Sequence, residues 1–201
     1  MTNPRSGRPR DDRIDSAVRQ ATLDLLGAVG YARLTLEAVA SRAGTSKPAL
    51  RRRWRGKPHL VVDALVTTVG ATPTPDTGCT RCDLVAGIQT LTDAFTTRIG
   101  QRVLPALVAD LADDPELAEV FLREYFHTRR ASTAAALRRG VARGDLDRGA
   151  DVDLLLDMLA STTYYRVLFG HLPVTPELAG QVVDVVLAGV ATPRLHCAHR
   201  V

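Results

Sequence analysis

The segment from Thr35 to Trp54 constrains the fold of this chain more than any other. Thr35 and Ser46 are each placed to cap a short helix, because a hydroxyl can accept a hydrogen bond from a backbone N–H of the first turn. Gly44 lies between the two helices, where a tight turn needs a backbone conformation that glycine adopts at little cost. Pro48 is tolerated in the first turn of the second helix. The segment therefore predicts a helix-turn-helix.

The rest of the chain is predicted to be helical as well. Hydrophobic residues make up 45% of the chain but aromatic residues only 4%, so its core must consist mainly of Leu, Val and Ala, of which Leu and Ala favour helix. We expect an all-α fold of about nine helices, in which an N-terminal three-helix helix-turn-helix domain precedes a larger helical bundle. The expected parts are a disordered basic arm over 1–10, the helix-turn-helix domain over 11–57, the bundle over 58–192 and a tail over 193–201.

Glycines and capping residues mark the expected helix ends. Gly30 should end the first helix, because glycine accepts the left-handed conformation that follows a last turn. Gly100 should separate a helix of the bundle from the short apolar segment that follows it. A long helix should begin at Asp114, with Pro115 in its first turn, and stop at Gly144. A break is expected over 71–78, and the last two helices over roughly 151–169 and 176–190.

The distribution of charge points to a polyanionic partner. Residues 1–57 hold 13 Arg or Lys and 5 Asp or Glu, whereas the remaining residues hold 13 and 17. A basic N-terminal quarter that coincides with a helix-turn-helix predicts contact with double-stranded DNA. Leu50 and Trp54 should anchor the second helix in the core, which leaves the opposite side to enter a major groove.

Three kinds of DNA contact are expected from this segment. The groove-facing side would carry Pro48, Ala49 and Arg52, flanked by Lys47 and Arg51. Phosphate contacts would come from side chains at the end of the helix and from hydroxyls at the helix starts. The full candidate set is Thr35, Thr45, Ser46, Lys47, Pro48, Ala49, Arg51, Arg52, Arg53, Arg55 and Lys57.

The last two expected helices are apolar on nearly every side. Such helices must be buried on most sides, so at the end of a chain they predict a two-fold interface with a second copy. Central packing within a monomer is the alternative. The residues expected at a homodimer interface are Leu155, Leu159, Val167, Val182 and Val186.

Aromatic and hydroxyl side chains on the central helices suggest a pocket for a small molecule. A mostly apolar lining with a few polar anchors suits a mostly apolar ligand, although ordinary core packing is the alternative for each residue. The candidate ligand-binding residues are Thr92, Phe95, Thr96, Phe121, Tyr125, Met158, Thr162 and Tyr165.

Cys79 and Cys82 form a single CxxC motif, with His196, Cys197 and His199 in the tail. These residues could bind zinc or sense oxidation, while two incidental loop cysteines are the alternative. Neither a resident metal nor a cofactor is expected. A thiol oxidoreductase built on this CxxC would need a strand-rich surround, whereas the chain offers helices.

The sequence favours neither an enzyme nor a membrane protein. It has no Ser-His-Asp spacing, no glycine-rich phosphate loop and no HExxH motif. Its N-terminus lacks the apolar stretch of a secretory signal, and no uncharged apolar run reaches the roughly 18 residues that a membrane span needs. We therefore expect a cytoplasmic, non-enzymatic protein without a membrane partner. An architectural DNA binder without an effector is the remaining alternative.

Residues 10–65 resemble the N-terminal domain of the TetR family of transcriptional regulators. In this comparison Arg51 stands where the family often has a Tyr that contacts phosphate, and Trp54 replaces the usual Phe. The matching residues are Ile14, Ala17, Gly30, Thr35, Val39, Ala40, Ala43, Gly44, Ser46, Leu50, Trp54, Lys57 and Leu60.

Residues of about 113–192 resemble the C-terminal domain of a TetR-like subgroup common in actinobacteria, through the stretches DDPELA, RRGVARGDL and DLLLDMLASTTYYRVLFG. No resemblance is assigned to residues 66–112. The resemblance implies a bundle that forms homodimers and binds a small-molecule effector. It also implies a repressor that binds a palindromic operator and is released when the effector binds.

Overall fold

A computed structural model describes residues 12–68, 72–96 and 98–197 of the chain. The expected disordered arm over 1–10 and the tail residue His199 lie outside these residues. Within them the fold is all-α, as expected, and the only extended pairing is an isolated bridge between Leu146 and Ala191. None of the helices in these ranges is both long and apolar enough to cross a membrane. The chain divides into two compact units, one ending at Ala64 and the other beginning at Leu65, inside the stretch that the sequence assigned to the bundle.

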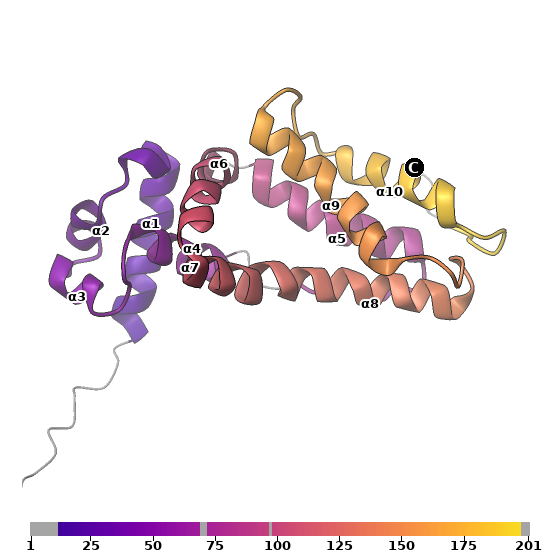
Figure 1. Ribbon diagram of the computed structural model, residues 1–201, viewed down its shortest axis with the longest axis horizontal. Coiled ribbons are helices and arrows are strands. Elements are labelled where there is room, and N and C mark those ends of the chain that lie inside the picture. The colour runs from indigo at the N-terminus through magenta and orange to yellow at the C-terminus, as the bar shows by residue number, and fades with distance from the viewer. Residues whose placement is uncertain (1–11, 69–71, 97, 198–201) are drawn as a thin grey trace, which may run out of the picture. The chain divides into compact units, whose positions relative to one another are not determined.

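The first unit contains the helix-turn-helix, shown in indigo and violet in Figure 1. Its elements are α1 (Asp12–Arg33), α2 (Leu36–Arg42), α3 (Lys47–Arg51) and the first part of α4 (Lys57–Thr68). Gly30 interrupts α1 with φ 77° and ψ 170°, a conformation that L side chains rarely adopt. The straight part of the first helix therefore ends at Gly30, as its sequence position predicted.

The predicted caps and turn of the helix-turn-helix are confirmed. The Thr35 hydroxyl accepts a hydrogen bond from the N–H of Ala38 at 3.2 Å, and the Ser46 hydroxyl accepts one from the N–H of Ala49 at 3.3 Å. Gly44 has φ 65°, which lies in the left-handed region. Three local signals therefore set the length of α2 and the start of α3.

The second unit is a bundle of longer helices. Pro115–Phe121 (α7), the π-helical turn Leu122–Phe126 (η1) and His127–Arg143 (α8) keep helical backbone angles at their junctions and form one continuous rod. With this rod counted once, the described residues contain nine helices, as expected. The remaining elements are α5 (Thr80–Thr96), α6 (Arg98–Asp113), α9 (Val152–Phe169) and α10 (Leu178–Val190).

The expected helix boundaries in the bundle are confirmed except at Gly100. Asp114 caps α7 by accepting a hydrogen bond from the N–H of Leu117 at 3.1 Å, and Gly144 ends α8 with φ 79°. Gly100 was expected to separate a helix from the segment after it, but it lies inside α6, which begins at Arg98. A single glycine costs a helix only about 1 kcal/mol, which is too little to end a helix without a stop signal beside it.

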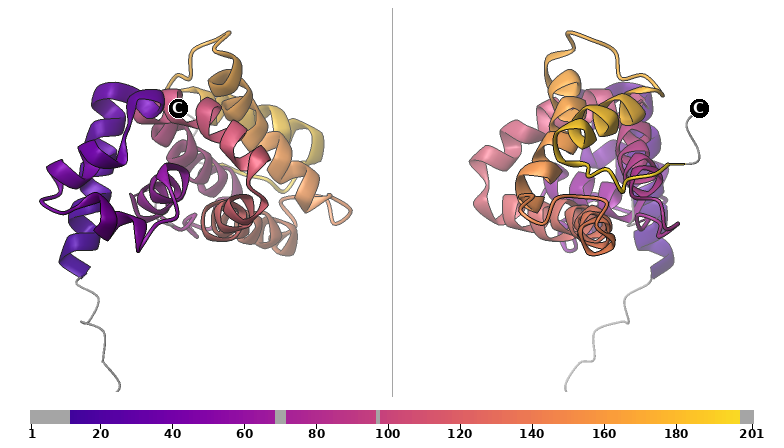
Figure 2. Two further views of the ribbon diagram at one scale, coloured as in Figure 1. Left: turned by 60° about the vertical axis from the view of Figure 1, so that its left-hand side comes forward. Right: turned by 90° about the vertical axis from the view of Figure 1, so that its right-hand side faces the viewer.

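Helix α5 is the central element of the bundle, because it contacts α8, α9 and α10 (Figure 2). The main core lies where these four helices meet and is built largely of leucine and valine, as the composition predicted. Its fully buried members include Leu84, Leu137, Leu159 and Val183. A smaller cluster of Leu91, Phe95, Leu104 and Val167 continues the core toward α6.

A buried polar network fixes the start of α5 against the end of α8. The fully buried carboxylate of Asp83 accepts hydrogen bonds from the N–H and the hydroxyl of Thr77, at 2.9 and 2.7 Å. Its other oxygen faces the guanidinium groups of Arg139 and Arg143 at 3.8 and 4.0 Å. Because the Asp83 carboxylate is removed from water, it depends on these partners for stabilisation.

Replacing Asp83 with alanine should therefore destabilise the bundle by about 3 kcal/mol, since two arginines would lose the carboxylate that they face. The measurement is urea unfolding of the full chain, followed by circular dichroism. The matched control is Asp93→Ala on the exposed side of the same helix, where a change of less than about 0.5 kcal/mol is expected. Equal losses for the two variants would contradict a stabilising role of the network.

Candidate functional site

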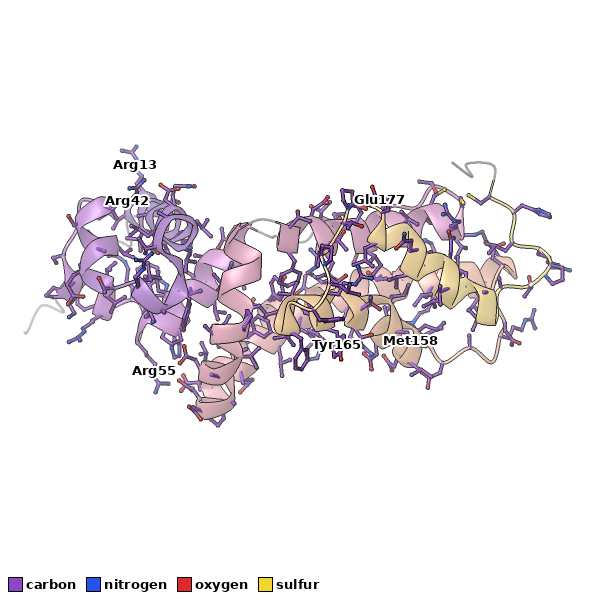
Figure 3. The ribbon with its side chains drawn as sticks, turned by 90° about the horizontal axis from the view of Figure 1, so that it is seen from above. Arg13, Arg42, Arg55, Met158, Tyr165 and Glu177 are labelled. Carbon is purple, nitrogen blue, oxygen red and sulfur yellow. The ribbon has the colours of Figure 1, made fainter. Side chains whose placement is uncertain are left out.

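The candidate DNA-contacting residues form an open cationic face on the first unit. Leu50 is fully buried and Trp54 nearly so, which holds α3 by one side as predicted. Figure 3 shows Arg55 pointing away from this unit. Of the predicted residues, Thr35, Ser46, Pro48, Arg51, Arg52 and Arg55 are exposed, whereas Thr45, Lys47, Arg53 and Lys57 are half-buried.

Ala49 does not lie on the open face, contrary to the sequence-based expectation. Its exposure is only 9%. Arg53, four residues further on, forms an ion pair with Asp15 of α1 at 2.7 Å. Positions four apart share one side of a helix, so this side of α3 and its last turn faces α1. Arg53 therefore acts first as a contact between helices.

Two lysines of the candidate set also have partners within the unit. Lys57 donates a hydrogen bond to the carbonyl oxygen of Tyr31 at 3.2 Å and lies 4.3 Å from the centre of its ring. Lys57 thereby supplies a hydrogen-bond donor to a backbone carbonyl just after the interruption at Gly30. Lys47 pairs with Glu37 at the surface, and this hydrogen bond lowers the pKa of Glu37. An exposed pair of this kind exchanges readily for another anion, whereas the Lys57 contact is part of the fold.

Sequence reasoning missed the residue that ties α4 to the helix-turn-helix. The indole N–H of Trp54 and Nε of Arg19 each donate to the same carboxylate oxygen of Asp63, both at 2.9 Å. The bond to Asp63 raises the pKa of Arg19. An acidic residue between the buried Leu60, Val61 and Ala64 was the available signal, because a charge beside a buried face usually has a partner.

The residues predicted for a dimer interface are buried within the chain itself. Leu155, Leu159, Val167, Val182 and Val186 pack in the two core clusters, so a second copy cannot reach them. Periodicity could not decide which side of α9 or α10 faces α5, because both helices are apolar on several sides. The exposed apolar side chains of these two helices are instead Leu154, Met158, Tyr165, Leu168 and Phe169 on α9 and Val185 on α10.

The candidate ligand-binding residues differ in their exposure. Met158 and Tyr165 are exposed, as Figure 3 shows, and Thr96 is exposed as well. The hydroxyl of the buried Thr92 is satisfied locally, by the carbonyl oxygen of Gln89 at 2.9 Å. Of the rest, Phe95 and Tyr125 are buried and Phe121 and Thr162 are half-buried.

A cleft between α5, α8 and α9 is the better candidate for ligand binding. Its cavity volume is about 50 Å³, and an adjoining hollow has about 370 Å³. Tyr164 lines both, with its ring edge-on to Phe95 at a centroid distance of 5.4 Å. The adjoining hollow reaches Tyr165 and Leu168 on the surface. The lining of the cleft is Gly87, Ile88, Leu91, Phe126, Arg129, Arg130, Thr133, Leu156, Ala160 and Tyr164.

The lining of the cleft is mostly apolar, and its polar members include Tyr164 and Arg130. Burial raises the pKa of Tyr164, so its hydroxyl stays protonated and can donate a hydrogen bond. Arg130 is held by Asp157 and Asp153, the latter at 3.0 Å, and these bonds raise the pKa of Arg130. In the sequence, two adjacent tyrosines, Tyr164 and Tyr165, indicated a ligand site on this helix. The packing of α9 turns Tyr164 rather than Tyr165 into the cleft.

Comparison with known proteins agrees with this arrangement. Residues 18–64 match a family model described as bacterial regulatory proteins of the tetR family. Residues 74–186 match another, described as the tetracyclin repressor-like C-terminal domain. This match begins well before residue 113, so it includes much of the 66–112 segment that the sequence analysis left without a resemblance.

Similar proteins extend over most of the chain. The HTH-type transcriptional regulator YdeS of Bacillus subtilis is 31% identical over 81% of this chain and 82% of its own length. The HTH-type transcriptional regulator AqdR of Rhodococcus erythropolis is 30% identical over 94% and 93%. The crystal structure of the TetR family regulator SCO0332 is 34% identical, covers 90% of this chain and all of its own, and has a TM-score of 0.73. The chain therefore belongs to the TetR family of DNA-binding transcriptional regulators.

Proposed function

We propose that this protein is a repressor that binds a palindromic operator as a homodimer and is released by a mostly apolar small molecule. The observation that carries the proposal is the cationic side of α3, exposed opposite the buried Leu50 and Trp54. The proposal assigns binding, and no catalytic step, to the chain.

The exposed arginines divide into two proposed roles. Arg51 and Arg52 leave the end of α3 on its exposed side, where a guanidinium can donate two hydrogen bonds to the edge of a guanine. Arg55 lies just beyond the helix and is suited to a phosphate. Arg53 is excluded from base reading in this proposal, because Asp15 already holds it.

Arg52→Ala should lower the affinity for the preferred duplex by about 1–3 kcal/mol and relax the sequence preference at one position of each half-site. Selection of bound duplexes from random DNA, followed by fluorescence anisotropy at fixed salt, measures both effects. Arg53→Ala is the contrasting variant: it should reduce thermal stability, because Asp15 loses its partner, without changing the selected motif. Recovery of duplexes without a shared motif by the unmodified protein would contradict sequence-specific binding.

A second copy of the chain is the proposed partner of the exposed side of α9. Leu154, Met158 and Tyr165 follow one side of this helix at intervals of four and seven residues, and Val185 is exposed on the neighbouring α10. An exposed apolar strip of this length, interrupted by Ser161, is unusual on a monomer. Two-fold pairing of α9 and α10 would bury it in a four-helix interface and present two copies of α3 to a palindrome.

Val185→Glu should convert the dimer to a monomer, because a carboxylate would be buried beside its own copy near the two-fold axis. Light scattering coupled to size-exclusion chromatography measures the mass of the particle in solution. Leu122→Glu is the matched control, since Leu122 is an exposed leucine that belongs to η1 and not to α9 or α10. A wild-type protein that is monomeric at micromolar concentration, or a dimer that survives Val185→Glu, would contradict this interface.

The cleft around Tyr164 is the proposed effector site. The cleft and the adjoining hollow together offer apolar walls to a ligand, and the Tyr164 hydroxyl offers a donor to one of its polar atoms. Such a ligand changes DNA affinity only to the extent that it prefers a conformation unsuited to the operator.

Ala160→Phe should fill this cleft, because Ala160 lines both the cleft and the adjoining hollow. The probe is the apolar fluorescent anion 1-anilinonaphthalene-8-sulfonate, whose emission rises on entry into an apolar site. We expect binding of the dye to fall by about 10-fold or more, while motif selection stays unchanged. Ala131→Phe on the exposed side of α8 is the control. Unchanged dye binding in Ala160→Phe would place the ligand elsewhere.

A further inference from the structure

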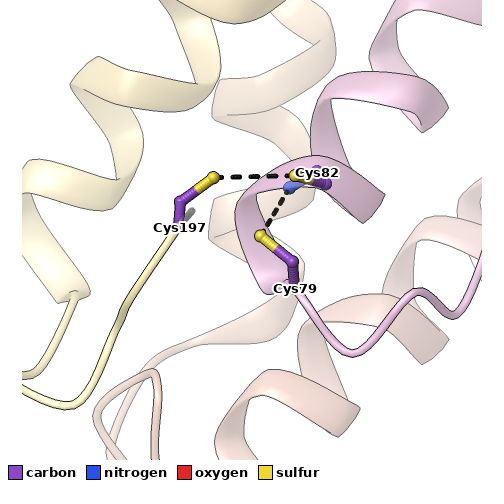
Figure 4. A group of neighbouring side chains, drawn as sticks. All are labelled: Cys79, Cys82 and Cys197. Atoms are coloured by element: carbon purple, nitrogen blue, oxygen red, sulfur yellow. Dashed lines mark hydrogen bonds between the residues drawn. The ribbon is translucent and has the colours of Figure 1, made fainter. Parts of the chain in front are cut away.

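The three cysteines of the chain come together at one end of the bundle (Figure 4). Cys79 directly precedes α5, Cys82 lies in its first turn, and Cys197 follows α10 along the chain. Their sulfur atoms all lie within 4.8 Å of one another, and Sγ of Cys82 is 3.6 Å from Sγ of Cys197. All three are half-buried thiols. The tail cysteine thus completes the single CxxC motif that the sequence showed.

Hydrogen bonds fix both segments that carry the cysteines, the start of α5 and the segment after α10. Between the first two cysteines, the Thr80 hydroxyl donates to Asp145 at 2.6 Å, which fixes the first turn of α5. The Cys82 N–H donates to Sγ of Cys79 at 3.4 Å, so the sulfur takes the place of a capping oxygen. On the other side, the N–H of Thr192 donates to the carbonyl oxygen of Asp145 at 2.9 Å, and its hydroxyl donates to the carbonyl oxygen of Gly144 at 2.6 Å. These bonds direct the segment that carries Cys197 toward α5.

The charge around the cluster suits a group of thiolates. Arg81 lies between the two cysteines in sequence, and its pKa is raised by Asp184, at 2.6 Å, and further by a hydrogen bond to Cys197. Arg81 and Cys197 also line an open groove with Leu195, which gives an ion a path from solvent. A cation beside the cluster offsets the excess negative charge that three thiolates leave around a divalent ion.

We propose that Cys79, Cys82 and Cys197 bind a thiophilic metal ion with a filled d shell, of which Zn²⁺ is the representative. Zinc–sulfur bonds of about 2.3 Å in a tetrahedron place sulfur atoms about 3.8 Å apart. The distance between Cys82 and Cys197 is already close to this value, and the third sulfur needs a shift of no more than about 1 Å. A water molecule or an added ligand completes the tetrahedron. Bound there, the ion joins the segment after α10 to the start of α5.

The same thiols favour metal binding over a redox role. A disulfide needs sulfur atoms about 2.05 Å apart and uses only two of the three cysteines. The pKa of Cys82 is raised to about 12 by a hydrogen bond to Cys79, by burial and by Cys197. A metal ion displaces thiol protons on binding, and here it would engage all three sulfur atoms rather than two.

The test uses the full chain, reduced and freed of metal with a chelator, and titrates it with Zn²⁺ and, in a parallel arm, Cd²⁺. We expect one ion per chain, ultraviolet thiolate-to-metal absorption with Cd²⁺, and protection of all three thiols from a thiol-specific reagent. Cys197→Ser should weaken binding by more than about 10-fold, since it removes one of three anchoring ligands. Arg194→Ala, an exposed change in the same segment, should leave binding unchanged.

Two outcomes would overturn the proposal. One is uptake of less than one ion per chain without protection of the thiols. The other is that the reduced protein binds no metal and that oxidised glutathione converts two of its thiols to a disulfide. That result would make the cluster a redox pair. Because neither DNA nor an effector is used in this experiment, its failure leaves the proposed regulatory function untouched.

Discussion

The orientation of the cationic side of α3 depends on the hydrogen bonds that the carboxylate of Asp63 accepts. Asp63 on α4 accepts from the Trp54 indole and from Arg19 on α1, so three parts of the first unit meet at this group. Leu50 and Trp54 bury one side of α3, but apolar burial is non-directional and would tolerate rotation of so short a helix. A directional bond to the indole removes that freedom. The orientation of Arg51 and Arg52 toward DNA therefore depends on a residue that itself contacts no DNA in the proposed complex.

The parts of the fold that the sequence predicted are those with local causes. Thr35 and Ser46 cap helices through hydrogen bonds three residues away, and Gly44 and Gly144 adopt positive φ angles that need only their own lack of a side chain. The exposed cationic side of α3 followed from the same local geometry once Leu50 and Trp54 were assigned to the core. These features require no knowledge of which helices pack together, which is why they could be predicted from one sequence.

The parts that failed depend on pairs of residues far apart along the chain. Arg53 is a helix contact because Asp15 lies opposite it, and Leu155 is core because α5 packs on that side of α9. An amphipathic pattern identifies the inner side of a helix only when the outer side is polar, and α9 and α10 lack that contrast. The choice between two adjacent tyrosines has the same cause: Tyr164 and Tyr165 differ by 100° on α9, and the packing decides which of them faces inward.

The position of Asp63 also bears on how a ligand in the second unit could reach the DNA-reading helix in the proposed mechanism. Helix α4 runs from Lys57 to Thr68 and so continues through the boundary between the units at Ala64 and Leu65. Its first turns carry two bonds into the helix-turn-helix, Lys57 to the carbonyl oxygen of Tyr31 and Asp63 to Trp54. A displacement of α4 would strain the bonds that Lys57 makes to Tyr31 and Asp63 makes to Trp54, just after α3. The ligand therefore needs no contact with α3: it suffices that it prefers a conformation of the bundle in which α4 has moved.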